Sequence, residues 1–368
     1  MKNFHSIITG AAVLSLVFTA CHDDGADIAA PVPGDTYTIE AAIDNGPQTR
    51  AQVQYGTQDA AAGELFMWND GDTFTLYDMT NPVPAEGPQT YTFTISAAYD
   101  ETHPTDKAVF TCSGEFIPES GHRYLALYNL RFDQMSESKA QCKLVTTDLS
   151  GYTQLRTDHP GNADIKNLQK GLMMYAFADT DVTGNLPSLQ FQHLTSLYRI
   201  SLTNGTADGV LINSINFVTD RDNPLWGSQR DYRDLAFLFD MDNRTVSDPD
   251  KTKYFFGLST MFNDTPGQEE YTTIASGETY ELYIPCIPLE NAHFADQQIM
   301  HIYFAEGDRD GTPSNYADLP FAEFAETNGV DHFERGKRYW FDLTIKDKDD
   351  QGRYVLEWTN YSPAPTTD

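Results

Sequence analysis

Apolar and polar residues alternate in short segments along almost the whole chain, and this pattern constrains the fold more than any other feature of the sequence. A period of two places every second side chain on one face of a β-strand. Clusters of Gly, Pro, Asn and Asp separate the segments, as turns do. The sequence therefore predicts an all-β protein of sandwich type, in which the longest candidate helix is Asn162–Met174. The clearest strands are Tyr37–Ile43, Phe74–Tyr77, Tyr91–Ile95, Tyr124–Tyr128, Leu197–Leu202, Tyr280–Ile284, Ile299–Phe304, Tyr339–Ile345 and Tyr354–Trp358.

Length and composition divide the chain into four segments. A chain of 368 residues exceeds what one core usually organises, so two domains are expected. Asp, Ala, Gly and Pro dominate the sequence from Cys21 to Asp35, which is typical of a tether that cannot bury enough apolar surface to fold. A second change of composition falls at Thr183–Pro187. We therefore expect a signal peptide over 1–20, a tether with one strand over 21–50, and β-sandwich domains over 51–187 and 188–368.

The N-terminus has the anatomy of a secretion signal. Lys2 precedes the apolar run Ile7–Phe18, and the small residues Thr19 and Ala20 precede Cys21. This order predicts a lipoprotein signal in which Cys21 carries the lipid, and an ordinary signal peptide is the alternative. This run is too short to span a bilayer, and no other stretch offers the roughly 18 apolar residues that a span needs, so the lipid is the expected membrane attachment.

The charge of the chain limits its binding partners, and its cysteine content limits its disulfide bonds. Asp and Glu number 54 against 24 Lys and Arg, so nucleic acid and anionic membranes would be repelled. With Cys21 lipidated, Cys112, Cys142 and Cys286 remain, and an odd number excludes a complete disulfide framework. A Cys112–Cys142 bridge and small buried thiols both stay open.

The sequence matches no known motif for catalysis or cofactor binding. The sequence has no Gly-rich phosphate loop, and the nearest match to a nucleophile elbow, Gly257–Met261, lacks its second glycine. The histidines lack metal-ligand spacing, and His193, between Phe191 and Leu194, is expected to be a hydrogen-bonded sandwich residue and not a metal ligand. Glu306–Ala317 carries carboxylates at positions one, three and five of a calcium loop but no Glu at position twelve, so a solvated turn is expected. We expect no enzyme activity, cofactor or metal.

Several segments, in order, resemble the fimbrillin family, the type V pilus subunits of Bacteroidetes-type bacteria. Each segment alone is also ordinary β-protein chemistry, such as an aromatic residue beside a Gly-Asp turn. Their order along the chain carries the resemblance. The segments are Cys21 with the acidic Asp23 and Asp24, Thr49-Arg50-Ala51, Phe66–Asp72 with its Trp-Asn-Asp-Gly-Asp, Leu189–Leu197, Tyr283-Ile284-Pro285, Gly336–Leu343 and Val355–Trp358.

The resemblance implies two transthyretin-like β-sandwich domains in tandem, export as an outer-membrane lipoprotein and no catalysis. It also implies assembly with other fimbrial subunits by exchanged strands, after an Arg-specific protease cuts between Arg50 and Ala51. The function implied is that of a stalk, anchor or tip subunit in cell-surface adhesion. The alternative is a surface lipoprotein that binds a glycan or host ligand and never polymerises.

Two segments are candidates for the exchanged strand. In the first, Tyr37, Ile39, Ala41 and Ile43 share one face and are expected to fill a groove in the N-terminal sandwich. The turn cluster Asp44–Pro47 follows, so Arg50 is expected in a loop that a protease reaches. The second segment is the C-terminal strand with Tyr354, Leu356 and Trp358 on one face, because the tail beyond it contains prolines that suit a strand poorly.

Overall fold

The computed structural model describes residues 36–44, 68, 70–96, 106–112, 114–144, 172–218, 236–247, 260–261, 272–286, 299–304, 316–320, 334–336 and 338–360. Within these ranges every regular element is a β-strand, which confirms the all-β prediction. Each of the nine strands named from the sequence overlaps an observed strand. None of the described residues forms a helix that is long and apolar enough to cross a membrane.

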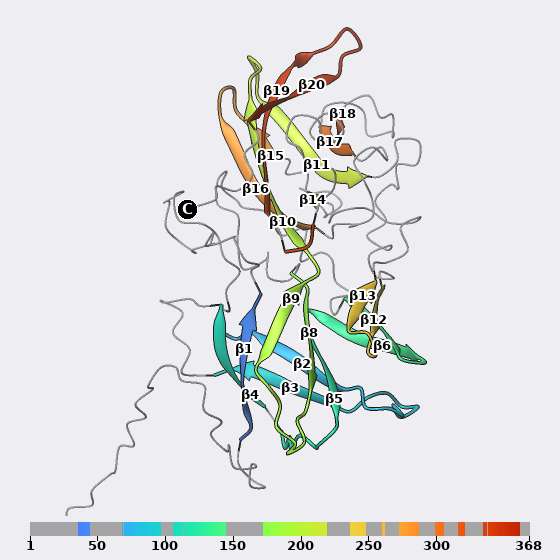
Figure 1. Ribbon diagram of the computed structural model, residues 1–368. Coiled ribbons are helices and arrows are strands. Elements are labelled where there is room, and N and C mark those ends of the chain that lie inside the picture. Colours follow the sequence, from blue (N-terminus) through green and yellow to red (C-terminus); the bar gives the residue numbers. More distant parts are fainter. Residues whose placement is uncertain are drawn as a thin grey trace, which may run out of the picture.

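Seven strands from the first half of the chain close a barrel (Figure 1). All neighbours pair antiparallel except β1 and β9, which run parallel. Closure gives each of the seven strands a paired neighbour on both sides. The order around it is β1 (Thr38–Ile43), β4 (Lys107–Cys112), β3 (Thr90–Ile95), β2 (Thr73–Asp78), β5 (Arg123–Tyr128), β8 (Met174–Asp179) and β9 (Leu189–His193).

Aromatic rings fill the barrel because every second residue of its strands points inward. Phe74 stacks on Phe93 with ring centroids 5.1 Å apart, and it also contacts Phe110 and Phe191. All four rings are buried. The alternation seen in the sequence is therefore the alternation between this core and the outer face of the barrel.

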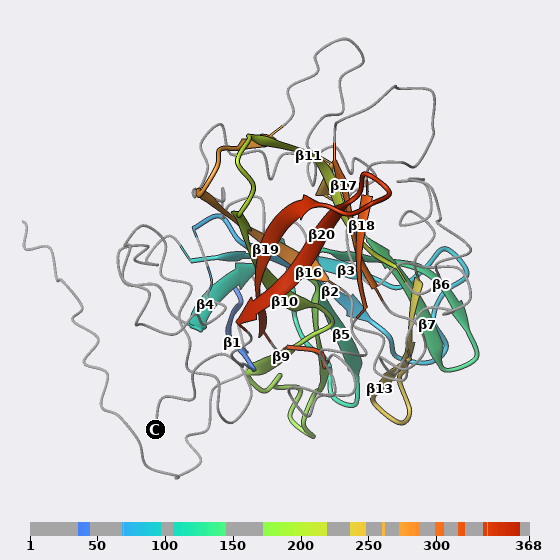
Figure 2. The same cartoon turned by 90° about the horizontal axis from the view of Figure 1, so that it is seen from above.

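The second half of the chain forms two open sheets that share a core (Figures 1 and 2). The four-stranded sheet has the order β16 (Thr279–Cys286), β10 (Ser196–Asn204), β19 (Arg338–Lys348) and β20 (Tyr354–Asn360). The other sheet contains β14 (Thr260–Met261), β11 (Val210–Val218), β17 (Ile299–Phe304) and β18 (Tyr316–Pro320), with β15 (Thr272–Ile274) also paired to β11. The Phe304 and Tyr354 rings meet between the sheets, 4.5 Å apart.

A fourth sheet joins the two halves of the molecule. Its order is β13 (Thr245–Ser247), β12 (Ala236–Asp240), β7 (Lys139–Leu144) and β6 (Leu130–Ser136), and it flanks the barrel (Figure 1). Strands β6 and β7 follow the barrel strand β5 in sequence, whereas β12 and β13 come from the second half. The pairing of β12 with β7 extends the same apolar core from the outer face of the barrel into the open sheets.

The domain boundary is expected near Thr183–Pro187, and the structure places this segment within the barrel. This segment is the loop between β8 and β9, and both strands belong to the barrel. The chain changes sheet between His193, the last residue of β9, and Ser196, the first of β10. The Gly, Asn and Pro of this segment mark a tight turn, in which Gly184 has a φ of 86°, and not a linker.

The structure also bears on the candidate helix and on the possible Cys112–Cys142 bridge. Met174 begins β8 instead of ending a helix, and residues 162–171 of that candidate helix lie outside the described ranges. Cys112 and Cys142 are free and buried, each in a different apolar cluster, so the bridge does not form. Burial raises the pKa of the Cys142 thiol. Cys21, Arg50, Ala51, residues 257–259 of the segment Gly257–Met261 and residues 306–315 also lie outside the described ranges.

Candidate strand-exchange site

Strand β1 is the closing strand of the barrel and is held on both flanks. Residues 38–42 pair with β4 antiparallel, and residues 41–43 pair with β9 in parallel. The backbone N–H of Asp44 continues the second ladder with a 2.7 Å bond to the carbonyl of Phe191. Ile39, Ala41 and Ile43 are buried in the barrel core, as the alternation predicted.

Trp68 connects β1 to the rest of the barrel core. Its indole Nε1 donates a buried 3.1 Å hydrogen bond to the carbonyl of Ala41. Phe110, Tyr128 and Phe191 meet the indole ring edge-on, with centroids 4.9, 5.7 and 5.4 Å away. Trp68 is also fully buried. Three rings therefore fix the indole, which binds the centre of β1.

Asp72 fixes the position of the Tyr128 ring that packs against Trp68. The Tyr128 hydroxyl donates a 2.8 Å hydrogen bond to Asp72 Oδ1, and the Ile95 N–H binds the Asp72 carbonyl. Gly71 before it has a φ of 80°, a conformation that favours glycine. The Gly-Asp pair that carries part of the family resemblance thus forms the turn into β2 and orients a tyrosine against Trp68.

Tyr37 lies where β1 enters the barrel. Its ring meets Phe116 edge-on at 4.9 Å and Phe93 at 6.4 Å, so it packs on the core as predicted. Burial raises the pKa of its hydroxyl, and a backbone hydrogen bond with Leu186 opposes that rise. The first residues of β1 are therefore anchored by an aromatic contact.

The C-terminal candidate strand, β20, is folded back on its own half of the chain. It pairs with β19 and is the last strand of its sheet. Tyr354 and Leu356 are buried in the shared core, and Trp358 packs against that core while remaining half-buried. The Lys348 ammonium lies 4.7 Å from the centroid of the Tyr354 ring.

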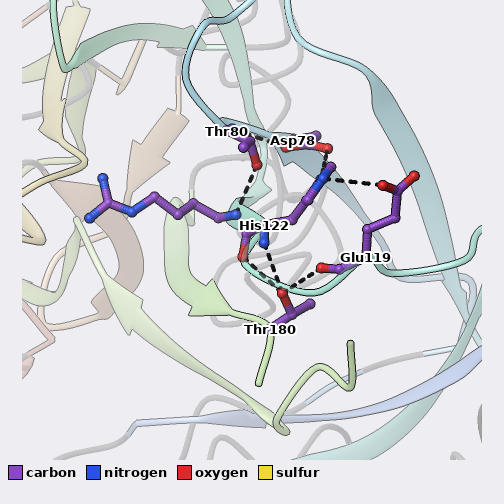
Figure 3. A network of polar contacts seen from close by, with 6 residues as sticks. Asp78, Thr80, Glu119, His122 and Thr180 are labelled. Atoms are coloured by element: carbon purple, nitrogen blue, oxygen red, sulfur yellow. Dashed lines mark hydrogen bonds and ion pairs between the residues drawn. The ribbon is translucent and has the colours of Figure 1, made fainter. Parts of the chain in front are cut away.

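A polar network at the end of β2, β5 and β8 is the other cluster of functional groups (Figure 3). His122 Nδ1 lies 2.7 Å from Asp78 Oδ2, and its Nε2 lies 3.5 Å from Glu119. The Thr180 hydroxyl donates to the Glu119 carbonyl and accepts from the His122 N–H. These Thr180 contacts go to backbone groups, so the cluster ties a loop to the strand ends. No metal-binding group of three His, Cys, Asp or Glu occurs among the residues that the structure describes.

Two crosswise ion pairs fasten the β12–β13 turn beside this network. Arg123 of β5 binds Asp242 at 2.8 Å, and Asp179 of β8 binds Arg244. Arg123 and Asp179 are direct cross-strand neighbours, so the four charges alternate in sign. The Phe239 ring of β12 packs 5.2 Å from Tyr175 of β8. We call these contacts, together with the β12–β7 pairing, the clasp.

Sequence reasoning located β1 and β20 but missed how they are held. The sequence indicated Trp68 only as part of the Phe66–Asp72 segment, and its bond to Ala41 joins positions 27 residues apart that no periodicity relates. The clasp likewise pairs strands from two halves of the chain. The expected hydrogen bond of His193 stays a prediction, and the structure shows that His193 is buried.

Comparison with known proteins gave structural likenesses alone. Neither a family model nor a curated protein matches the chain. A putative cell adhesion protein from Bacteroides uniformis is similar with a TM-score of 0.39 and 12% identity, over 89% of this chain and 98% of that one. A putative adhesin from Bacteroides thetaiotaomicron has a TM-score of 0.40 and 10% identity, over 91% and 98%. The C-terminally truncated tip fimbrial protein Mfa3 from Porphyromonas gingivalis has a TM-score of 0.35 and 10% identity, over 88% and 97%.

Proposed function

We propose that the chain is a fimbrillin-like pilus subunit (stalk, anchor or tip) with two transthyretin-like domains, which acts in cell-surface adhesion. In this proposal it is exported as an outer-membrane lipoprotein through Cys21, and it joins other subunits by strand exchange after an Arg-specific protease cuts at Arg50. The observation that supports exchange is the place of β1. It fills the gap between β4 and β9, and it lies before Arg50 in the sequence.

Removal of β1 would create a site for another strand. Both β4 and β9 would lose a ladder of backbone hydrogen bonds, and Trp68 would lose the Ala41 carbonyl. Unpaired buried backbone groups cost free energy, which a strand from another subunit recovers by β-augmentation. Proteolysis would therefore convert a closed monomer into one with an open barrel that binds a further chain.

The C-terminal strand β20 is the second strand proposed for exchange. It pairs on one side only, so it can leave its sheet without opening the strands beyond β19. Its departure would expose the core residues Tyr354 and Leu356.

Brief digestion of the purified chain with an Arg-specific protease tests the proposal. We expect a new N-terminus at Ala51 and higher-order oligomers on size analysis, and the Arg50→Gln chain to remain uncut and monomeric. Cleavage at Arg50 that leaves a stable monomer would favour the non-polymerising surface lipoprotein. If the protease does not cut at Arg50, the exchange lacks its proposed trigger.

Metabolic labelling with an acyl precursor tests the export route. The wild-type chain should take up the label, and Cys21→Ser should not. Equal labelling of the two chains would contradict the lipid anchor and leave an ordinary secreted protein.

A further inference from the structure

We propose that Trp68 selects the strand that fills the gap between β4 and β9, so that only an extended segment with a small residue between two inward aliphatic residues fits. This inference rests on the proposed function, because it specifies which partner the opened barrel accepts. In the structure the gap holds Ile39, Ala41 and Ile43, and the indole of Trp68 binds the backbone carbonyl of Ala41, the small residue among the three.

The size limit follows from how tightly Trp68 is held. Its Nε1 lies 3.1 Å from the carbonyl of Ala41, so the edge of the ring lies directly against the backbone of that residue. Phe110, Tyr128 and Phe191 surround the ring, and the exposed fractions of Trp68 and Ala41 are both 0%. Extra methylene groups at this position would require movement of a close-packed aromatic cluster.

The same contact fixes the register of the incoming strand. A slide by two residues would put a larger aliphatic residue such as Ile39 or Ile43 at the buried position whose carbonyl binds the indole. A slip by one residue would turn every side chain over and bring the exposed Glu40 into the core. Only one alignment keeps a small residue at Trp68 and keeps charge outside.

Strand β20 from a second copy does not meet these conditions. Its inward residues are Tyr354, Leu356 and Trp358, and none of them is small. The opposite face would bring Glu357 into the barrel, where an unpaired carboxylate is costly. The partner is therefore an extended segment of the pattern aliphatic-x-small-x-aliphatic, as in β1, and not the C-terminal strand of another copy.

Labelled peptides test this selection on the full chain after cleavage at Arg50. The β1 peptide, residues 36–44, should be captured, and its Ala41→Leu version should bind roughly tenfold or more weakly. A Glu40→Leu peptide is the matched control, because the same side chain then points to the outer face, and its binding should stay within about twofold. A peptide of residues 354–360 should not be captured. Equal capture of the Ala41→Leu peptide, or capture of the 354–360 peptide, would overturn the selection while leaving strand exchange intact.

A second measurement on the uncut chain separates the selection from the exchange. Ala41→Val should lower the midpoint of unfolding, and Glu40→Val should not. Combining Ala41→Val with Trp68→Leu should recover part of the loss, because the smaller side chain makes room. If no peptide binds but this recovery is seen, strand exchange fails and the size limit at Trp68 holds. Additive effects of the two substitutions would overturn the size limit.

Discussion

The two strands proposed for exchange, β1 and β20, occupy opposite surroundings. Strand β1 lies between two neighbours in a closed barrel, and a buried tryptophan binds its centre. Strand β20 is the last strand of an open sheet, and Val355 and Glu357 on its outer face are exposed. A central strand leaves two open edges and an aromatic core behind, whereas an edge strand leaves one. Removal of β1 therefore leaves a gap that another strand must fill, whereas removal of β20 breaks only its ladder with β19.

Truncation of one inward residue in each strand should give the largest contrast. Ile39→Ala in β1 should cost about 4 kcal/mol of unfolding free energy, near the upper end for aliphatic truncations. Leu356→Ala in β20 should cost about 2 kcal/mol, because an edge strand can move to close the cavity. Chemical denaturation measures both values. Equal costs would mean that barrel closure does not hold β1 more firmly than β19 holds β20.

Acid should destabilise the folded chain through His193, which lies where the last strand of the barrel meets the second half. This residue ends β9, and its ring lies 3.6 Å from where a side chain on Gly336, in the turn before β19, would begin. Burial lowers the pKa of His193 from 6.5 to about 3. The unfolded chain therefore binds a proton below pH 6.5 that the folded chain does not, so folded stability falls as pH decreases toward 3.

The His193 contribution is measured as a difference in pH dependence. Between pH 7 and pH 5 the wild-type chain should lose about 2 kcal/mol more unfolding free energy than His193→Phe, which cannot take up the proton. Carboxylates titrate in both chains and cancel in the difference. Parallel pH profiles for the two chains would show that His193 becomes protonated in the folded barrel at little cost.

Loss of the indole N–H should affect stability differently at Trp68 and Trp358. Trp68→Phe keeps a ring in the barrel core but removes the donor to the Ala41 carbonyl, so about 1–2 kcal/mol of unfolding free energy should be lost. Trp358→Phe is the matched change in β20, where the ring is half-buried, and its cost should be smaller. Thermal unfolding measures both. A larger effect at Trp358 would contradict the central role of Trp68.

The sequence predicted the strands well and their partners poorly. Alternation depends on which face of a strand is buried, so it located β1 and β20 and named their inward residues correctly. Sheet pairing joins residues far apart in the chain, and nothing local in residues 139–144 indicates that they pair with residues 236–240. The same holds for the turn cluster at Thr183–Pro187, which lies near the expected domain boundary and connects two paired strands of the barrel. Composition identifies a turn, but it does not say whether the strands on either side share a sheet.

The smallest effect is expected from the clasp, whose ion pairs join the barrel to the second half at its surface. Asp242 is exposed, and hydrogen bonds from Arg123 and Ser138 lower the pKa of its carboxyl. Because salt screens exposed charges, Asp242→Ala should reduce stability slightly at low salt and not measurably at 1 M salt.

Asp349→Ala is the matched control for the clasp. Backbone N–H bonds from Arg353 and Gln351 lower the pKa of Asp349, within the turn between β19 and β20. Salt screens such short backbone bonds less than it screens an exposed ion pair, so the cost of this change should persist at 1 M salt. Thermal unfolding of the three chains at low and high salt gives the comparison. An Asp242→Ala cost that persists at high salt would mean that the turn is held by its backbone bond from Met241 to the Ser138 carbonyl and by Phe239, and not by its charges.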